Sequence, residues 1–153
     1  LIVEPFAVSH DAADPIGINV FAGKDKATVV TDTGVISDSI LRRMDDTTLL
    51  VLEANYDPHM LRFGPYQPFL KQRVASDEGH LSNEMAAQAL LMMNRPDFMQ
   101  VILAHRSENN NNAVLVTQTI GKMLVDGGVR IGPEMKLQHG QPNEIVSMKS
   151  VKR

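Results

Sequence analysis

The chain has 153 residues, of which 43% are hydrophobic, and a formal net charge of −3. This length fits one domain with a sizeable buried core, and the acidic balance argues against a broadly basic surface that coats nucleic acid. Cysteine is absent, which excludes disulfides and thiolate metal sites and is compatible with a cytoplasmic protein. The longest apolar stretches fall short of the roughly 18 residues of a membrane span, so we expect no membrane partner.

The first part of the chain predicts three strands. Residues 1–9 form a β-rich run that leads to His10. Residues 17–22 and 26–31 are two further β-rich runs, and the turn signal Gly23-Lys24-Asp25 between them is typical of a hairpin. Because the chain opens directly on an apolar run without an initiator Met, we interpret it as a domain whose upstream residues are absent.

The rest of the chain alternates between helical patterns and strands. Continuous apolar runs at residues 48–53 and 99–104 predict strands that are buried on both faces. This alternation indicates an α/β fold. Cap residues and apolar spacing place helices at 37–43, 66–75, 83–94 and 113–125, and two short strands are expected at 134–138 and 144–148.

Three polar residues directly follow predicted strands, namely His10, Asp32 and His105. A lone histidine at a strand end is more often hydrogen-bonded or at the surface than a metal ligand, and Asp32-Thr33-Gly34 taken alone is an ordinary turn. Taken together, two imidazoles and one carboxylate are donors that suit a divalent metal ion. Three ligands cannot complete two metal sites, so the set is chemically incomplete.

Five segments between residues 8 and 112 occur in a characteristic order: VSHDAADP, TDTG, LEANYDPHML, DEGHLSNEMAAQA and LAHRSENNN. In this order they resemble the metallo-β-lactamase-fold hydrolase superfamily, specifically its YycJ-type branch of phosphodiesterases and nucleases. The resemblance implies an α/β fold in which this chain is the C-terminal half of an αββα sandwich, a mixed β-sheet with flanking helices.

The resemblance also implies a pair of metal ions. In the superfamily a His-x-His-x-Asp-His run in the N-terminal half, followed later by a His, an Asp and a His, holds both ions. The later three correspond to His10, Asp32 and His105, with Asp32 bridging the pair. The His-x-His-x-Asp-His run does not occur in this sequence, so we expect weak or no metal binding and no activity from the isolated chain. Its missing N-terminal half would be its partner, and zinc and manganese both fit nitrogen and oxygen donors.

Further residues are expected to handle the substrate. His80 and Glu53 resemble the histidine and acidic residue that shuttle protons in the tRNA 3′-processing endonucleases of the superfamily; alternatively, His80 is a helix-entry residue that bonds local backbone. Asp11 is expected to steer a ligand imidazole. Substrate contacts are expected at Asn55, Ser107, Asn110 and Asn111, although a solvated loop is an equal interpretation of the asparagine run.

The predicted function is a metal-dependent hydrolase, a phosphodiesterase or nuclease for DNA or RNA that uses a water activated by two metal ions. Two alternatives stay open. The same scaffold hydrolyses thioesters or lactones, and the chain alone would also suit a non-catalytic fragment or interaction module. A homo-oligomer is a further alternative, because a missing half would leave an apolar sheet face uncovered.

Overall fold

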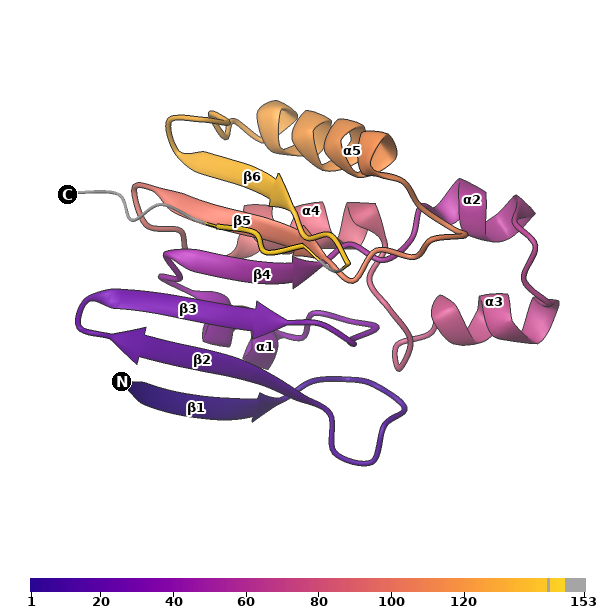
Figure 1. Cartoon of the computed structure of the whole chain (residues 1–153), viewed down its shortest axis with the longest axis horizontal. Helices are drawn as coiled ribbons and strands as arrows, with labels where there is room; N and C mark the ends of the chain where they lie inside the picture. The colour runs from indigo at the N-terminus through magenta and orange to yellow at the C-terminus, as the bar shows by residue number, and fades with distance from the viewer. Residues whose placement is uncertain (143, 148–153) are drawn as a thin grey trace.

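A mixed six-stranded sheet forms the centre of the computed structural model, which describes residues 1–142 and 144–147 (Figure 1). The two hairpin connections make β1, β2 and β3 antiparallel, whereas β3, β4, β5 and β6 run parallel. The carboxyl ends of these last four strands therefore meet at one edge. In their order across the sheet the strands are β1 (Ile2–Ala7), β2 (Ile16–Ala22), β3 (Asp25–Val30), β4 (Leu49–Glu53), β5 (Met99–Ala104) and β6 (Met135–His139).

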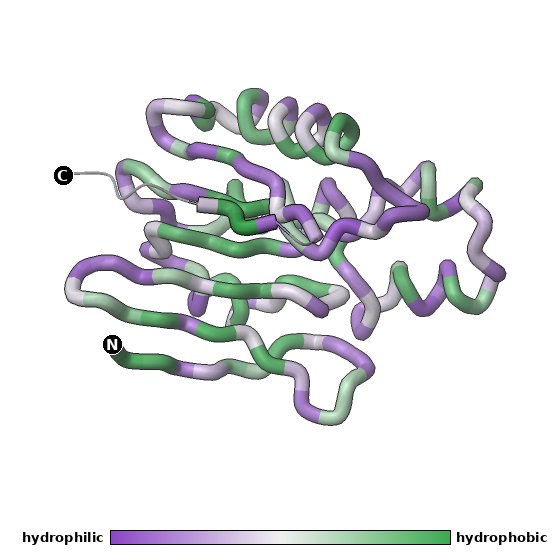
Figure 2. Tube along the Cα trace, viewed as in Figure 1, coloured by the Kyte–Doolittle hydropathy of each residue, from purple (hydrophilic) through white to green (hydrophobic). Residues whose placement is uncertain are grey.

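Three helices pack on one face of the sheet and enclose the main core. In β4 the side chains of Leu50 and Leu52 are fully buried, and in β5 Met99, Val101 and Leu103 point into the same core. Figure 2 shows the strands as mostly hydrophobic segments and the connection between β5 and α5 as hydrophilic. The helices are α1 (Asp38–Met44), α2 (Pro58–Phe63), α3 (Pro68–Val74), α4 (Asn83–Met92) and α5 (Ala113–Asp126), of which α1, α4 and α5 contribute to this core.

The opposite face of the sheet carries a row of apolar side chains in register. Ile18 pairs with Val29, Val29 pairs with Val51, and Val51 pairs with Ile102. All four are only partly buried. A mixed sheet with helices on one face and an apolar opposite face is the layer expected of half a sandwich.

The helix α2 and the end of the chain differ from the sequence predictions. Asp57-Pro58 reads as a turn initiator, yet Asp57 caps α2 by accepting a hydrogen bond from the Met60 N–H at 2.8 Å, and Pro58 occupies the first turn. Proline is favoured in the first turn because a backbone N–H at that position has no acceptor inside the helix, so its absence in proline costs nothing. The strand predicted at 144–148 is wrong for 144–147, which form no strand, and residue 148 lies outside the described residues. The helix predicted over 83–94 ends two residues early, at Met92.

Within the described part of the chain, no helix combines the length and the apolar character that crossing a bilayer requires.

Candidate metal and catalytic site

The carboxyl ends of three neighbouring strands bring Asp32, Glu53 and His105 to one edge of the sheet. The loop after β1 adds His10, and the segment before α4 adds His80. Asp32 and His105 both have left-handed backbone conformations, with φ of 55° and 53°. Such conformations are uncommon for residues other than glycine and are concentrated at functional sites, where the surrounding fold holds them in place.

Glu53 is a fully buried carboxylate with three hydrogen-bond donors around it. Its Oε1 accepts from Nδ1 of His80 at 2.7 Å and from Nδ1 of His105 at 2.8 Å, and its Oε2 accepts from the Thr33 N–H at 3.0 Å. Burial alone would raise the pKa of Glu53, but the hydrogen bonds from His105, His80 and Thr33 together lower it below its usual value. Glu53 is therefore ionised, and each imidazole presents Nδ1–H to it and keeps Nε2 free.

The Nε2 atoms of two histidines face the carboxylate of Asp32. Nε2 of His105 lies 3.6 Å from Oδ1 of Asp32, and Nε2 of His10 lies 3.8 Å from the same oxygen. Nδ1 of His10 is 3.0 Å from the Gly79 carbonyl, to which it donates. Donors about 2.1 Å from one tetrahedral ion lie about 3.4 Å apart, so this spacing fits a divalent ion after small movements.

His80 lies between the two other imidazoles, with ring centroids 5.1 Å from His10 and 5.2 Å from His105. Geometry alone groups His10, Asp32 and His80 as one set of potential ligands, and Glu53, His80 and His105 as another. The second set is better described as a hydrogen-bonded network, because Glu53 meets the imidazoles at their Nδ1–H side. The structure thus brings together all five residues that were predicted to bind metal or shuttle protons.

Gly79 can supply the carbonyl for His10 because it has no side chain. A Cβ at this position would lie 2.2 Å from the Arg73 carbonyl oxygen and 2.4 Å from that of Val74. Any larger residue would push the segment before α4 away from the sheet edge. This carbonyl is a contact that the sequence analysis did not anticipate.

Asp11, predicted to steer a ligand imidazole, lies beside Nε2 of His10 and not beside its Nδ1. The Gly79 carbonyl takes the Nδ1 side of His10, whereas Oδ1 of Asp11 lies 3.5 Å from Nε2, the atom that would bind metal. The main partner of Asp11 is Arg73, which donates two hydrogen bonds and holds the pKa of the Asp11 carboxyl below its usual value. Asp11 therefore anchors α3 beside the site.

The asparagines predicted to contact substrate form hydrogen bonds that support the loop. Asn55 donates to the His105 carbonyl at 2.7 Å and so holds the left-handed turn. The buried Asn111 donates to the carbonyls of Ala54 and Asn55 at 3.0 and 3.1 Å and bonds the Asn83 side chain. Asn110 is fully buried. Asn110 has no exposed surface, so its predicted substrate contact is corrected. Asn55 and Ser107 line a hollow beside the histidines and Asn111 is 4% exposed, and for these three the substrate contact stays a prediction.

A hollow of about 370 Å³ adjoins the histidines. It is formed by the connection between β5 and α5 on one side and by α3 on the other. Besides His80, His105 and Ser107, its lining includes Tyr66 and Arg106, two residues that the sequence analysis did not single out.

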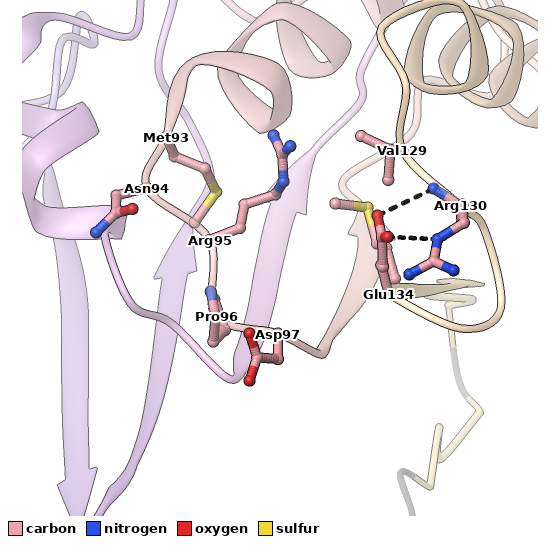
Figure 3. Close-up of a pocket in the computed structure, with 9 residues that line it drawn as sticks. Met93, Asn94, Arg95, Pro96, Asp97, Val129, Arg130 and Glu134 are labelled. Atoms are coloured by element: carbon pink, nitrogen blue, oxygen red, sulfur yellow. Dashed lines mark hydrogen bonds and ion pairs between the residues drawn. The ribbon is translucent and has the colours of Figure 1, made fainter.

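A second hollow, of about 540 Å³, lies at the opposite end of the sheet, where β5 and β6 begin (Figure 3). Three of its charged groups are engaged locally: Arg130 pairs with Glu134 at 2.5 Å, and Arg95 donates to the Leu90 carbonyl at 2.6 Å. No metal-ligand cluster of the described residues lies there. The chemistry is therefore concentrated at the carboxyl edge of the sheet.

Comparison with known proteins agrees with this geometry, although no family model matches the chain. The chain is 34% identical over 140 residues to the exodeoxyribonuclease YycJ of Bacillus anthracis, and 33% identical over 141 residues to the exodeoxyribonuclease WalJ of Streptococcus pneumoniae serotype 2 strain D39. Each alignment covers 92% of this chain. The chain is a homologue of YycJ and WalJ. It spans about half the length of these relatives, 53% of YycJ and 52% of WalJ.

The fold comparison agrees with these relatives. The metallo-β-lactamase-fold protein YhfI of Bacillus subtilis superimposes with a TM-score of 0.58 at 14% identity, over 89% of this chain and 46% of YhfI. The chain therefore has an α/β fold that matches part of a metallo-β-lactamase-fold protein, which confirms the predicted fold class.

Replacing Asn111 should destabilise the domain. Asn111→Ala would remove a buried donor to the Ala54 and Asn55 carbonyls and the hydrogen bonds with the Asn83 side chain, at a cost of about 1–3 kcal/mol. Urea unfolding followed by circular dichroism measures this. Asn109→Ala is the matched control, because Asn109 is exposed and its side chain makes one long contact, at 3.5 Å, with Tyr66. Equal stability of the two variants would contradict the structural role of Asn111.

Removing the charge of Glu53 should change the titration of His105. The hydrogen bond that His105 donates to Glu53 raises the pKa of His105 above its usual value, because it stabilises the imidazolium form. We expect Glu53→Gln to lower this pKa, as measured by an NMR pH titration of the metal-free protein. Glu134→Gln, remote from the site, should leave it unchanged. A His105 pKa that stays the same in Glu53→Gln would rule out the carboxylate as the cause.

Proposed function

We propose that this chain is the C-terminal half of a metal-dependent phosphodiesterase that acts on nucleic acid, with DNA as the favoured substrate. One observation carries the proposal: the buried Glu53 carboxylate fixes His80 and His105 by their Nδ1 atoms, while the Nε2 atoms of His105 and His10 face Asp32. The names of the relatives, exodeoxyribonucleases, support hydrolysis of phosphodiesters in DNA.

His10, Asp32 and His105 would hold two divalent ions together with ligands from the N-terminal half. Asp32 would bridge them, and the position of its Oδ1, which faces both imidazoles, supports this role. A donor set of nitrogen and oxygen without thiolate fits zinc or manganese. When bound, such a pair supplies positive charge for the phosphate and lowers the pKa of a water molecule.

His80 is the residue that would move a proton. The ionised Glu53 holds its Nδ1–H, which fixes both the ring plane and the tautomer. When Nε2 also carries a proton, a histidine oriented in this way can deliver that proton to the leaving oxygen of a phosphodiester and return to the neutral Nδ1–H form. Glu53 also holds His105, so one carboxylate positions a ligand and a proton donor at once. This shared carboxylate favours a catalytic role for His80 over the alternative that His80 only begins the helix and bonds local backbone.

The remaining alternatives are less well supported. The fold by itself does not distinguish phosphodiesters from thioesters or lactones; the preference comes from the relatives. A non-catalytic module would have little reason to keep a buried carboxylate between two imidazoles, an arrangement typical of functional sites. A cytoplasmic location is part of the proposal and rests on the absence of cysteine.

Replacing Asp32 in the whole protein, with its N-terminal half, should abolish activity. We expect Asp32→Ala to lower turnover of bis(p-nitrophenyl) phosphate and of DNA by about 10³-fold or more, because the bridge between the two ions is lost. Asp46→Ala is the matched control: Asp46 has the same left-handed conformation, with φ of 57°, but its side chain bonds Asn94. Turnover by Asp32→Ala equal to that of Asp46→Ala would remove Asp32 from the mechanism.

A further inference from the structure

Residues 58–74, which form α2, α3 and their connection, carry a surface unlike the rest of the chain. This segment contains Arg62, Lys71 and Arg73 and no acidic residue, although the net charge of the whole chain is −3. It also holds three of the seven aromatic residues, Phe63, Tyr66 and Phe69. Basic and aromatic side chains are thus gathered in one short segment.

The two phenylalanines of this segment point into solvent. Phe63 is 68% exposed and Phe69 is 71% exposed, and no other phenylalanine in the described part of the chain is classed as exposed. The Phe63 ring lies 4.6 Å from the His59 ring, and the Arg62 guanidinium lies 5.4 Å from its centroid. A small cluster of Tyr56, Leu61 and Val74, against which Tyr66 and Leu70 pack, supports the segment from below.

The cations of the segment are only partly neutralised. Arg73 pairs with Asp11, as described above. Lys71 donates to the Arg62 carbonyl at 2.8 Å. Neither Lys71 nor Arg62 has a carboxylate partner among the described residues. On the opposing loop, Glu108 lines the adjoining hollow beside Arg106, so their charges offset each other there.

The segment also lies next to the candidate site. Figure 1 shows α2 and α3 beyond the carboxyl ends of β3, β4 and β5. The hollow of about 370 Å³ connects the two, because Tyr66, Leu70 and Arg73 line it together with His80 and His105. An extended ligand bound across α2 and α3 would therefore reach the candidate site at the sheet edge through this hollow.

We propose that residues 58–74 form a binding platform for single-stranded DNA. Exposed aromatic rings stack with bases, and unpaired cations lie beside phosphates, so both features of the segment match the chemistry of one ligand. The apolar rings alone would suit a protein partner, but their combination with positive charge on an acidic chain favours a polyanion with flat bases. The role of this platform in guiding DNA to the candidate site rests on the proposed function, whereas DNA binding by the platform does not.

The test measures DNA binding without cleavage. Fluorescence anisotropy of a labelled oligothymidylate is recorded with the whole protein in EDTA. We expect the double variant Phe63→Ala with Phe69→Ala to bind about 10- to 100-fold more weakly. Met92→Ala is the control, because Met92 is 67% exposed on α4. Phe69→Trp should retain binding, since it keeps a stacking surface, and equal thermal stability of all variants shows that the fold is intact.

The salt dependence gives an independent readout of the charges. Arg62→Ala should reduce the slope of log affinity against log salt concentration by about 0.7, the value for one phosphate contact on a single strand. Arg42→Ala, an exposed arginine on α1, should leave the slope unchanged.

Two results would overturn the platform: oligothymidylate binding by the double phenylalanine variant as tight as that of the unmodified protein, or no binding by the unmodified protein. The latter would mean that another part of the protein covers this surface. Retained turnover of bis(p-nitrophenyl) phosphate with a raised KM for oligonucleotide in the double variant would support it. If the unmodified protein binds oligothymidylate through Phe63 and Phe69 but hydrolyses no phosphodiester, the proposed function fails and the platform stands.

Discussion

A fully buried carboxylate at the end of the central strand β4 holds two imidazoles by their Nδ1 atoms. Burying an isolated charge is strongly unfavourable, and it is tolerated here because three donors surround Glu53. The consequence reaches beyond Glu53 itself. Since the Nδ1 sides of His80 and His105 are occupied, their chemistry is confined to Nε2, and for His105 this atom faces Asp32. The candidate site depends on this one interaction.

The surrounding fold supplies what Glu53 needs. The parallel arrangement of β3, β4 and β5 puts Asp32, Glu53 and His105 on neighbouring strand ends. Asn55 fixes the backbone of His105 through its carbonyl, and Gly79 lets the segment before α4 approach closely enough to orient His10. Each contact joins residues far apart in the chain. Preorganisation of this kind keeps donors in place before any ligand arrives.

Features set by neighbouring residues could be predicted from the sequence, whereas most features set by residues far apart in the chain could not. Strands such as β5 were predicted at their observed bounds, because a continuous apolar run is a local signal. The cluster of His10, Asp32 and His105 was anticipated from strand ends together with resemblance. The helix α2 was missed because Asp57-Pro58 is compatible with both a turn and a helix start. Nothing local shows that Asn111 is buried, or that the partner of His10 is a carbonyl 69 residues away.

The tautomers of the clustered histidines decide whether Glu53 orients His80 and His105. Nitrogen chemical shifts of the imidazoles would be recorded by NMR on the metal-free protein, at a pH above the titration of His105, with the exposed His59 as internal reference. The account predicts that His80 and His105 carry their proton on Nδ1, where Glu53 accepts it, and that His10 does so toward Gly79. A neutral ring with its proton on Nε2, for His80 or His105, would contradict it, because Glu53 would then not be holding that ring by its Nδ1–H.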